Sequence, residues 1–233
     1  MKITAVETLR LKRHGTLIWL RLHTDEGVTG LGESWFGAAA IEADIHDRLA
    51  PVLLGQDPSR IEHLNRKMLP YVGFQGTGAE IRALSAADVA LWDIAGKLAE
   101  QPIHRLLNPN SHKKQLPVYA SLMRMQDATN VAKVSADAVA RGYRHIKLHE
   151  RTLECVSAAR DAIGSDVALM LDTNCAWRVD QAIDQAKKMA DQNLFWLEEP
   201  IFPADDYVGL GSVQDEGGIS VAAGENLGTF YDF

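Results

Sequence analysis

The sequence predicts an α/β fold, in which a small antiparallel sheet with helices is followed by a series of parallel β-α units. In residues 1–35, short runs of alternating apolar and polar residues are separated by a glycine-containing turn at 24–27, as is typical of antiparallel strands. After residue 115, short apolar runs alternate with segments of helical periodicity, which is typical of parallel strands joined by helices. These two patterns define the fold class.

A polar stretch that contains Pro109 lies between the two patterns, at 108–115. Such polar, proline-containing segments often link domains. We therefore expect a first domain at 1–110 and a second domain at 111–233.

Local signals predict the elements of both domains. Asp57-Pro58 is a typical helix start, with an N-cap acid and proline at the first helical position, and apolar residues from Ala87 to Leu98 recur at helical spacing. The first domain is also expected to have strands within 1–35, a helix at about 38–51 and a glycine-rich loop at 70–79. The second domain is expected to have strands at Leu116–Leu122, Tyr143–His149, 167–172, 194–198 and 219–224, and helices at about 126–141, 152–163, 179–192 and 205–214.

Composition excludes several classes of partner. The 233 residues carry a formal net charge of −7, whereas a nucleic-acid-binding surface needs a basic patch. We find no apolar stretch of membrane-spanning length, and the first residues alternate like a strand instead of forming a signal peptide. Two cysteines, Cys155 and Cys175, do not make a disulfide framework. We therefore expect a reduced, cytoplasmic protein that binds neither nucleic acid nor membrane.

Three carboxylates at near-equal spacing are the main functional signal. Asp172, Glu198 and Glu225 are separated by 26 and 27 residues, about one strand-helix repeat, and each closes a short apolar run. Acids at the carboxyl ends of neighbouring parallel strands converge on one face. Three converging oxygen donors suit a hard cation such as Mg²⁺. A single acid at a strand end could instead cap the next helix, but three in register favour a metal site.

Two basic residues precede this acid set by one strand. Lys147 and His149 are two residues apart at a strand end, so their side chains point to the same face. Beside a metal cluster they are candidates for proton transfer. In the alternative interpretation, Lys147 forms a structural salt bridge with Glu150 or Glu198, and His149 is a core histidine.

The residues are suited to removing a proton next to a carboxylate. A divalent cation can bind the substrate carboxylate and stabilise the enediolate that forms when the α-proton leaves. Burial and a nearby cation both lower the pKa of a lysine, and a histidine beside the cation stays neutral. Asn174 shares the face of Asp172, where it could contact substrate, orient a ligand or cap the next helix.

Two long motifs resemble a known family. The sequence LMLDTN at 169–174, with Ala182, Met189 and WLEEP at 196–200, resembles the second signature of the mandelate racemase/muconate lactonising enzyme family of the enolase superfamily. The stretch SAADVALWDIAGKLAEQPIHRLL, at 85–107, resembles the first signature of that family.

The resemblance implies an α+β capping domain and a modified (β/α)₇β TIM-like barrel, of which this sequence holds the first five strands. Asp172, Glu198 and Glu225 match the metal-ligand positions of the family, and the implied cofactor is Mg²⁺. Lys147 and His149 match its Lys-x-Lys base motif, with histidine at the second lysine. The proton acceptor is therefore His149, Lys147 or the pair.

The family's last three barrel strands, with an Asp-His dyad, have no counterpart in this sequence. Five parallel strands leave an unpaired apolar edge, which favours aggregation or pairing with a partner. We therefore expect a fragment of a longer enzyme or a truncated gene product, and the 233-residue chain alone could be inactive.

The capping domain is expected to supply substrate contacts. The candidates are His14 in the first loop, Trp35 near the end of the sheet, and Tyr71, Phe74 and Gln75 in the glycine-rich loop. The alternative for the aromatic residues is packing within the cap.

The activity implied by the resemblance is Mg²⁺-dependent dehydration of a sugar acid, a small-molecule carboxylate. A racemase or epimerase, or a lactone cycloisomerase, would form the same enolate and differ in the later step. A non-catalytic fragment that serves in binding or assembly is an alternative of another class. The family also implies a homo-oligomer when the chain is complete.

Overall fold

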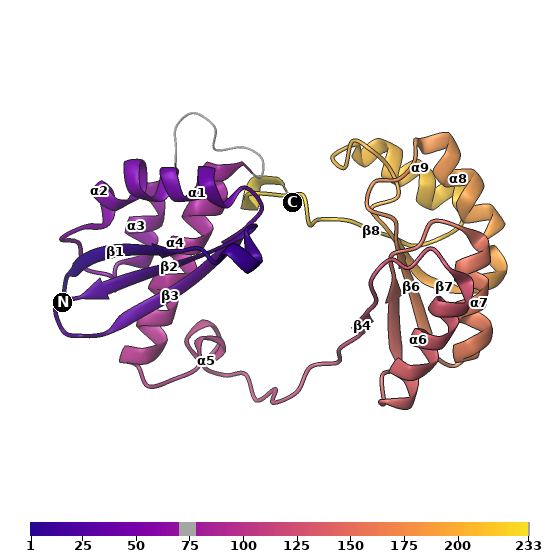
Figure 1. The fold of residues 1–233 in the computed structure, drawn as a ribbon, viewed down its shortest axis with the longest axis horizontal. Helices are drawn as coiled ribbons and strands as arrows, with labels where there is room; N and C mark the ends of the chain where they lie inside the picture. Colours follow the sequence, from indigo (N-terminus) through magenta and orange to yellow (C-terminus); the bar gives the residue numbers. More distant parts are fainter. Residues whose placement is uncertain (70–77, 233) are drawn as a thin grey trace. The chain divides into compact units, whose positions relative to one another are not determined.

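The structure of the protein, a computed structural model, describes residues 1–69 and 78–232 and divides the chain into two compact units. The first unit comprises Met1–Lys113 with Leu227–Phe233, and the second comprises Lys114–Asn226 (Figure 1). Each unit has its own cluster of buried apolar side chains, so each is described by itself.

The first unit contains a three-stranded antiparallel sheet in the order β1-β2-β3. Its strands are β1 (Ile3–Leu9), β2 (Leu17–Thr24) and β3 (Thr29–Trp35). Along β2, the buried residues Ile18, Leu20 and Leu22 alternate with more exposed ones, because successive side chains point to opposite faces. The buried face packs against the helices of this unit.

The helices of this unit follow the sheet along the chain. They are α1 (Ala38–Asp44), the π-helix η2 (Ile45–Leu49), α2 (Ala50–Leu53), α3 (Ile61–Met68), α4 (Ala79–Leu98) and α5 (Ile103–Leu107), with the 3-10 turns η1 (Lys12–His14) and η4 (Phe230–Asp232). The helix start predicted at Asp57-Pro58 was wrong, since α3 begins at Ile61. Asp57 Oδ1 instead accepts the backbone N–H of Ser59 at 2.9 Å and closes a turn.

Helix α4 lies very close to strand β3. A Cβ added to Gly30 would lie 2.2 Å from the carbonyl oxygen of Ala90, and one added to Gly32 would lie 1.9 Å from that of Ala86. Real Cβ atoms do not tolerate such contacts, so these glycines allow the helix to approach the strand.

The second unit contains a five-stranded parallel sheet in the order β4-β5-β6-β7-β8. Its elements are β4 (Ala120–Ser121), α6 (Ala128–Ala140), β5 (His145–Leu148), α7 (Leu153–Ile163), β6 (Ala168–Asp172), α8 (Val179–Lys188), η3 (Ala190–Gln192), β7 (Leu194–Glu198), α9 (Tyr207–Gly217) and β8 (Val221–Ala222). The strand-helix alternation confirms the predicted α/β class, with β-α units of a partial TIM-like barrel after a capping unit.

The first strand of this sheet is shorter than predicted. The sequence favoured a strand at Leu116–Leu122, but the paired residues are Ala120 and Ser121, opposite Ile146 and Lys147 of β5. Because β5 itself begins at His145, the residues before Ala120 have no paired segment in the described part of the sheet.

The two faces of the parallel sheet differ in chemistry. Leu169 and Leu171 of β6 belong to the core formed with helices, whereas Asp172 lies on the opposite face. Lys147 of β5 and Glu198 of β7 share that opposite face with Asp172. The strand pairing aligns Asp172 with Glu198, which brings charged groups together at the carboxyl ends of the strands.

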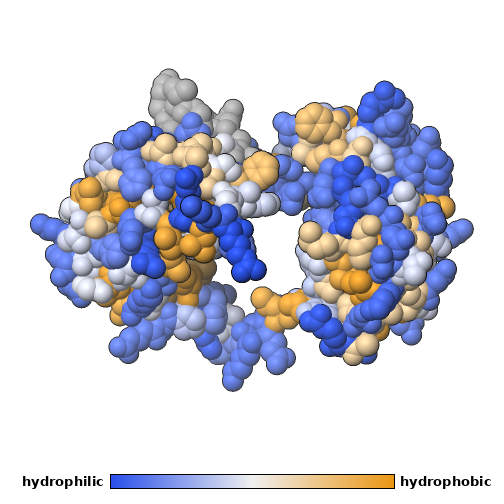
Figure 2. All heavy atoms as spheres, in the orientation of Figure 1, coloured by the Kyte–Doolittle hydropathy of each residue, from blue (hydrophilic) through white to orange (hydrophobic). Residues whose placement is uncertain are grey.

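The visible surface of each unit is largely hydrophilic, with scattered apolar patches (Figure 2). Exposed large apolar side chains include Trp35, Phe36, Leu107, Leu116 and Val118. In residues 1–69 and 78–232, no helix combines the length and apolar character required to cross a bilayer.

Candidate active site

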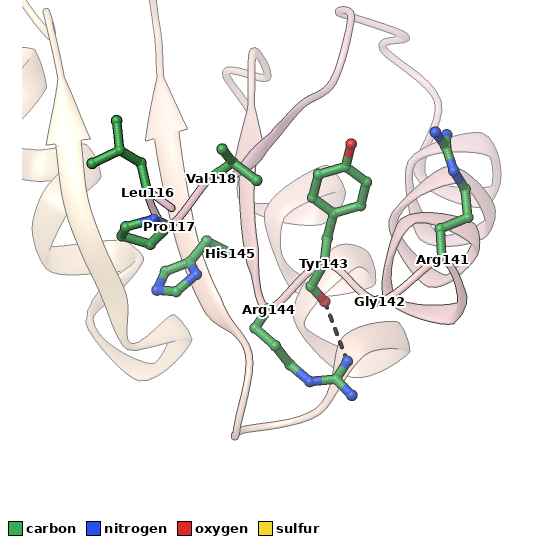
Figure 3. A pocket seen from close by; sticks show the side chains of 8 residues that line it. All are labelled: Leu116, Pro117, Val118, Arg141, Gly142, Tyr143, Arg144 and His145. Carbon is green, nitrogen blue, oxygen red and sulfur yellow. Dashed lines mark hydrogen bonds between the residues drawn. The ribbon is translucent and has the colours of Figure 1, made fainter. Parts of the chain in front are cut away.

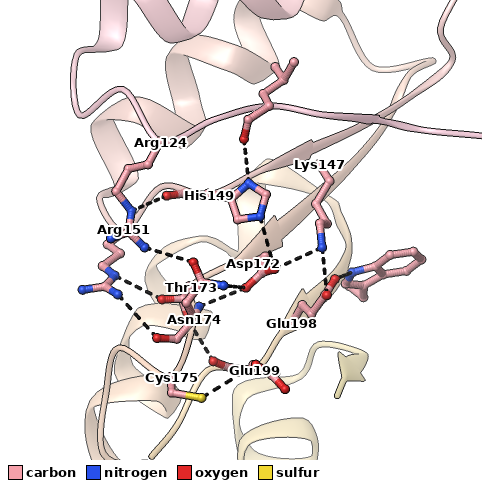
Figure 4. A network of polar contacts seen from close by, with 12 residues as sticks. Arg124, Lys147, His149, Arg151, Asp172, Thr173, Asn174, Cys175, Glu198 and Glu199 are labelled. Carbon is pink, nitrogen blue, oxygen red and sulfur yellow. Dashed lines mark hydrogen bonds and ion pairs between the residues drawn. The ribbon is translucent and has the colours of Figure 1, made fainter. Parts of the chain in front are cut away.

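A buried lysine connects the carboxylates at the ends of β6 and β7. Lys147 Nζ lies 3.0 Å from Asp172 Oδ2 and 2.8 Å from Glu198 Oε1 (Figure 4). The Lys147 side chain is 9% exposed and that of Asp172 is 2% exposed, so water screens this ion cluster poorly. The structure therefore brings together three of the residues that the sequence singled out.

The pairing keeps Lys147 in its ammonium form. Burial acts to lower the pKa of Lys147, but hydrogen bonds and negative charge from Glu198 and Asp172 outweigh it, and the pKa is raised. In this arrangement Lys147 keeps its proton and forms ion pairs with both carboxylates.

His149 follows β5 and is oriented by a backbone carbonyl. Its Nδ1 lies 2.6 Å from the carbonyl oxygen of Leu122, and its Nε2 lies 3.4 Å from Asp172 Oδ2. A carbonyl oxygen can only accept, so Nδ1 carries a proton. In the neutral ring, Nε2 therefore carries the lone pair and lies on the side of Asp172.

Each of the two paired carboxylates has one oxygen held by a fixed donor. Asp172 Oδ1 accepts from the backbone N–H of Asn174 at 2.9 Å and from its side-chain amide at 3.0 Å. Glu198 Oε2 accepts from Trp196 Nε1 at 2.9 Å. The remaining oxygens, Asp172 Oδ2 and Glu198 Oε1, both point to Lys147 Nζ.

Glu225 follows β8 and is exposed. Partial burial of its carboxyl, and then the negative charges of Glu199 and Asp172, raise its pKa, while Lys147 acts in the opposite direction. Within the described part of the chain, no three His, Cys, Asp or Glu side chains form a group that could hold a metal ion. The charges of the cluster therefore act on the Glu225 carboxyl. In the described residues, however, this carboxyl does not form a metal-ligand group with Asp172 and Glu198.

The donor set nevertheless suits a hard divalent cation. Asp172, Glu198 and Glu225 offer carboxylate oxygens, and burial, followed by the negative charges of Glu199 and Asp172, raises the pKa of Glu225. Mg²⁺ prefers such oxygen ligands. A cation bound by Asp172 and Glu198 would compete with Lys147 for the same two oxygens.

Several supporting contacts were not predicted from the sequence. Arg124 donates to the carbonyl oxygen of His149 at 2.7 Å and to Asn174 Oδ1 at 3.3 Å. Glu150 is 2% exposed and accepts the backbone N–H groups of Met125 and Gln126. One sequence signal could have pointed to Glu150. It follows His149 and is the second charged residue directly after the end of a strand.

A second buried acid, Glu199, supports the end of β7. It is 2% exposed and accepts from Asn226 Nδ2 at 3.0 Å with both oxygens. Asn174, Cys175 and Glu199 all have positive φ angles, which are uncommon for residues other than glycine. Such strained backbone concentrates at functional sites.

The substrate contacts predicted in the capping domain fall in the first unit or outside the described residues. His14 is exposed in η1. Trp35, at the end of β3, is 57% exposed and packs edge-on against Phe36, with the two ring centroids 5.7 Å apart. Tyr71, Phe74 and Gln75, like most of the glycine-rich loop, lie outside the described residues. Their roles stay predictions.

A separate open cavity of about 560 Å³ lies at the opposite end of β5 (Figure 3). It is lined by Leu116, Pro117, Val118, Arg141, Gly142, Tyr143, Arg144 and His145. None of the predicted site residues lines it, so it is distinct from the Lys147 cluster.

Comparison with known proteins identifies relatives over nearly the whole chain. A 3,6-anhydro-alpha-L-galactonate cycloisomerase from Streptomyces coelicolor is 36% identical over 228 residues, covering 93% of this chain and 62% of the relative. A D-galactonate dehydratase from Ralstonia pickettii is 30% identical, covering 100% of this chain and 64% of the relative. The chain thus spans about three-fifths of the length of these relatives.

The fold has close structural counterparts. The crystal structure of a racemase from Streptomyces coelicolor with bound magnesium matches with a TM-score of 0.88 and 33% identity, covering 99% of this chain and 71% of that one. Residues 3–108 match the mandelate racemase/muconate lactonizing enzyme N-terminal domain, and residues 130–233 match the enolase C-terminal domain-like family. The chain therefore belongs to the mandelate racemase/muconate lactonizing enzyme family of the enolase superfamily.

Proposed function

We propose that the protein removes the proton α to the carboxylate of a sugar acid in a Mg²⁺-dependent reaction, and that the reaction is a dehydration. The observation that carries this proposal is the convergence of Lys147, Asp172 and Glu198 at the carboxyl ends of adjacent parallel strands, with His149 beside them. Barrel-type enzymes place their chemistry at this end of the strands.

The metal would be held by Asp172, Glu198 and Glu225, whose donor set fits it. When bound, Mg²⁺ supplies positive charge that stabilises the enolate form of the substrate carboxylate. We assign the second unit to this chemistry and the first unit to substrate recognition, with His14 and Trp35 as proposed contacts.

His149 is the better candidate for the proton acceptor. Its Nδ1 proton is engaged by the carbonyl of Leu122, which leaves Nε2 to take the α-proton. Lys147 is an ammonium in this arrangement, so its proposed role is to hold a proton and offset negative charge beside Asp172. Arg124 and Asn174 keep His149 and Asp172 in place.

Cycloisomerisation is the second candidate, because a relative at 36% identity is a cycloisomerase of an anhydro-galactonate. Cycloisomerisation and dehydration share the first step, the removal of the α-proton. They differ in the group that the enolate then expels or attacks. Racemisation shares that step too, and a racemase is among the matched structures.

The shared step is tested by exchange of the α-proton in D₂O. The chain with Mg²⁺ is incubated with a panel of sugar acids, and deuterium incorporation and 2-keto-3-deoxy products are followed by NMR. We expect α-proton exchange or 2-keto-3-deoxy product with at least one acid, and a fall of more than about a hundredfold in that rate in His149→Asn.

The matched control is Lys133→Met, which removes an exposed lysine that pairs with Asp137 on α6. This variant should exchange like the wild type. Wild-type reaction that persists in His149→Asn would contradict the assigned acceptor, and the absence of both α-proton exchange and 2-keto-3-deoxy product with every acid would contradict the proposed function.

A further inference from the structure

The indole N–H of Trp196 donates a hydrogen bond to one carboxylate oxygen of Glu198, a proposed metal ligand. Trp196 and Glu198 lie two residues apart on β7, so their side chains share one face of the sheet. Trp196 Nε1 lies 2.9 Å from Glu198 Oε2, while Lys147 Nζ lies 2.8 Å from Oε1. The two oxygens of this carboxylate are therefore used differently.

The N–H group of Trp196 is held in place, and it cannot itself bind a metal ion. An indole N–H is a donor only and does not ionise at ordinary pH. Tyr119 packs edge-on against the Trp196 ring, with centroids 6.1 Å apart at 82°, and Phe195 packs at 5.2 Å and 49°. These contacts hold the indole N–H against Oε2.

Asp172 has the same arrangement on the neighbouring strand. Its Oδ1 is held by two donors of Asn174, and its Oδ2 faces Lys147. Both carboxylates therefore present a single oxygen, Asp172 Oδ2 or Glu198 Oε1, to a common cation.

We propose that the indole N–H of Trp196 sets the metal selectivity of the site by restricting Glu198 to one-oxygen ligation. Mg²⁺ requires near-octahedral geometry with short bonds of about 2.1 Å, which single carboxylate oxygens and water satisfy. Ca²⁺ takes about six to eight oxygens and often uses both oxygens of a carboxylate. The capped carboxylates thus favour Mg²⁺ over Ca²⁺. This inference rests on the proposed metal site at Asp172 and Glu198.

The test compares Mg²⁺ and Ca²⁺ affinities of the full chain by calorimetry. Trp196→Phe keeps an aromatic ring and removes the N–H donor, so Glu198 Oε2 becomes available. We expect the preference for Mg²⁺ over Ca²⁺ to fall by about tenfold, the effect of about one hydrogen bond to a charged group. Trp19→Phe is the matched control, because it makes the same change on β2 of the first unit and leaves the Trp196 donor in place; its selectivity should equal that of the wild type.

A second variant keeps the proposal testable if Trp196→Phe does not fold, as judged by circular dichroism. Asn174→Gly removes the side-chain donor to Asp172 Oδ1, and glycine tolerates the positive φ of 49° at this position. It should shift the selectivity in the same direction by a smaller factor. Unchanged selectivity in folded Trp196→Phe overturns the inference alone, and where Trp196→Phe does not fold, unchanged selectivity in Asn174→Gly does so. A wild-type chain without Asp172-dependent Mg²⁺ binding overturns the proposed function, and the inference with it.

Discussion

At the scale of single residues, the site is a buried ion cluster whose partners come from three strands. Removing one member of such a cluster leaves another charge buried and uncompensated, which is costly. Asp172 is the most connected member, since it contacts Lys147, His149 and Asn174. Substitutions there should affect binding and stability together.

Cys175 allows the electrostatics of this region to be measured directly. Burial, then the negative charge and hydrogen bond of Glu199, raise the pKa of the Cys175 thiol to about 11. Thiolate is the reactive form, so at pH 8 a disulfide reagent should modify Cys175 about a hundredfold more slowly than an ordinary cysteine. The rate is measured in a Cys155→Ala background, in which Cys175 is the remaining thiol.

Glu199→Gln removes the negative charge beside the thiol and should accelerate the reaction. Glu154→Gln, an exposed acid on α7, is the control and should leave the rate unchanged. Wild-type reaction at the rate of a free thiol would contradict the raised pKa.

The sequence could predict the meeting of Lys147, Asp172 and Glu198, because carboxyl ends of consecutive parallel strands lie at one edge of a sheet. It could not predict that Trp196 caps Glu198. That contact depends on side-chain rotamers and on an irregularity in the pairing of β6 with β7 near Met170. Hydrogen bonds of this kind have no signature in spacing or composition.

At the scale of elements, the contact of α4 with β3 is the tightest requirement of the first unit. Gly32→Ala would place a Cβ 1.9 Å from the carbonyl oxygen of Ala86, so the helix must shift. We expect the free energy of unfolding to fall by about 2 kcal/mol, the usual size of an overpacking effect. Urea unfolding followed by circular dichroism measures it.

Gly15→Ala is the control for this substitution. Apart from the glycine itself and its two chain neighbours, no described residue has an atom within 4 Å of a Cβ at Gly15, and its φ of −61° suits alanine. This variant should be as stable as the wild type or slightly more stable. Equal stability of Gly32→Ala and Gly15→Ala would show that α4 does not need the close approach.

Elements with a strong periodic pattern were predicted well from the sequence. The ends of elements that depend on contacts with another segment of the chain were not. The periodicity of α4 and of the strand-helix repeats is local, so it is visible in the sequence. The length of β4 is set by where β5 begins, and the start of α3 by the turn at Asp57. Neither constraint appears in the apolar pattern of the segment itself.

At the scale of the whole molecule, the chain contains an antiparallel capping unit and a parallel unit, each with its own apolar core. The α/β class was predictable because both units follow simple alternation rules. The proposed metal ligands, the proposed base and their supporting residues described above all belong to Lys114–Asn226. Metal binding should therefore report on the folding of this unit.

The most direct test of the account is a Mg²⁺ titration of the 233-residue chain by calorimetry and thermal shift, alongside Asp172→Asn and Asp180→Asn. Asp180 is an exposed acid on α8 that pairs with Arg178, so it serves as the matched control. We predict saturable binding and a raised melting temperature in the wild type and in Asp180→Asn, and the loss of both in Asp172→Asn. Binding that survives in Asp172→Asn, or is absent in the wild type, would contradict a metal site built on this carboxylate.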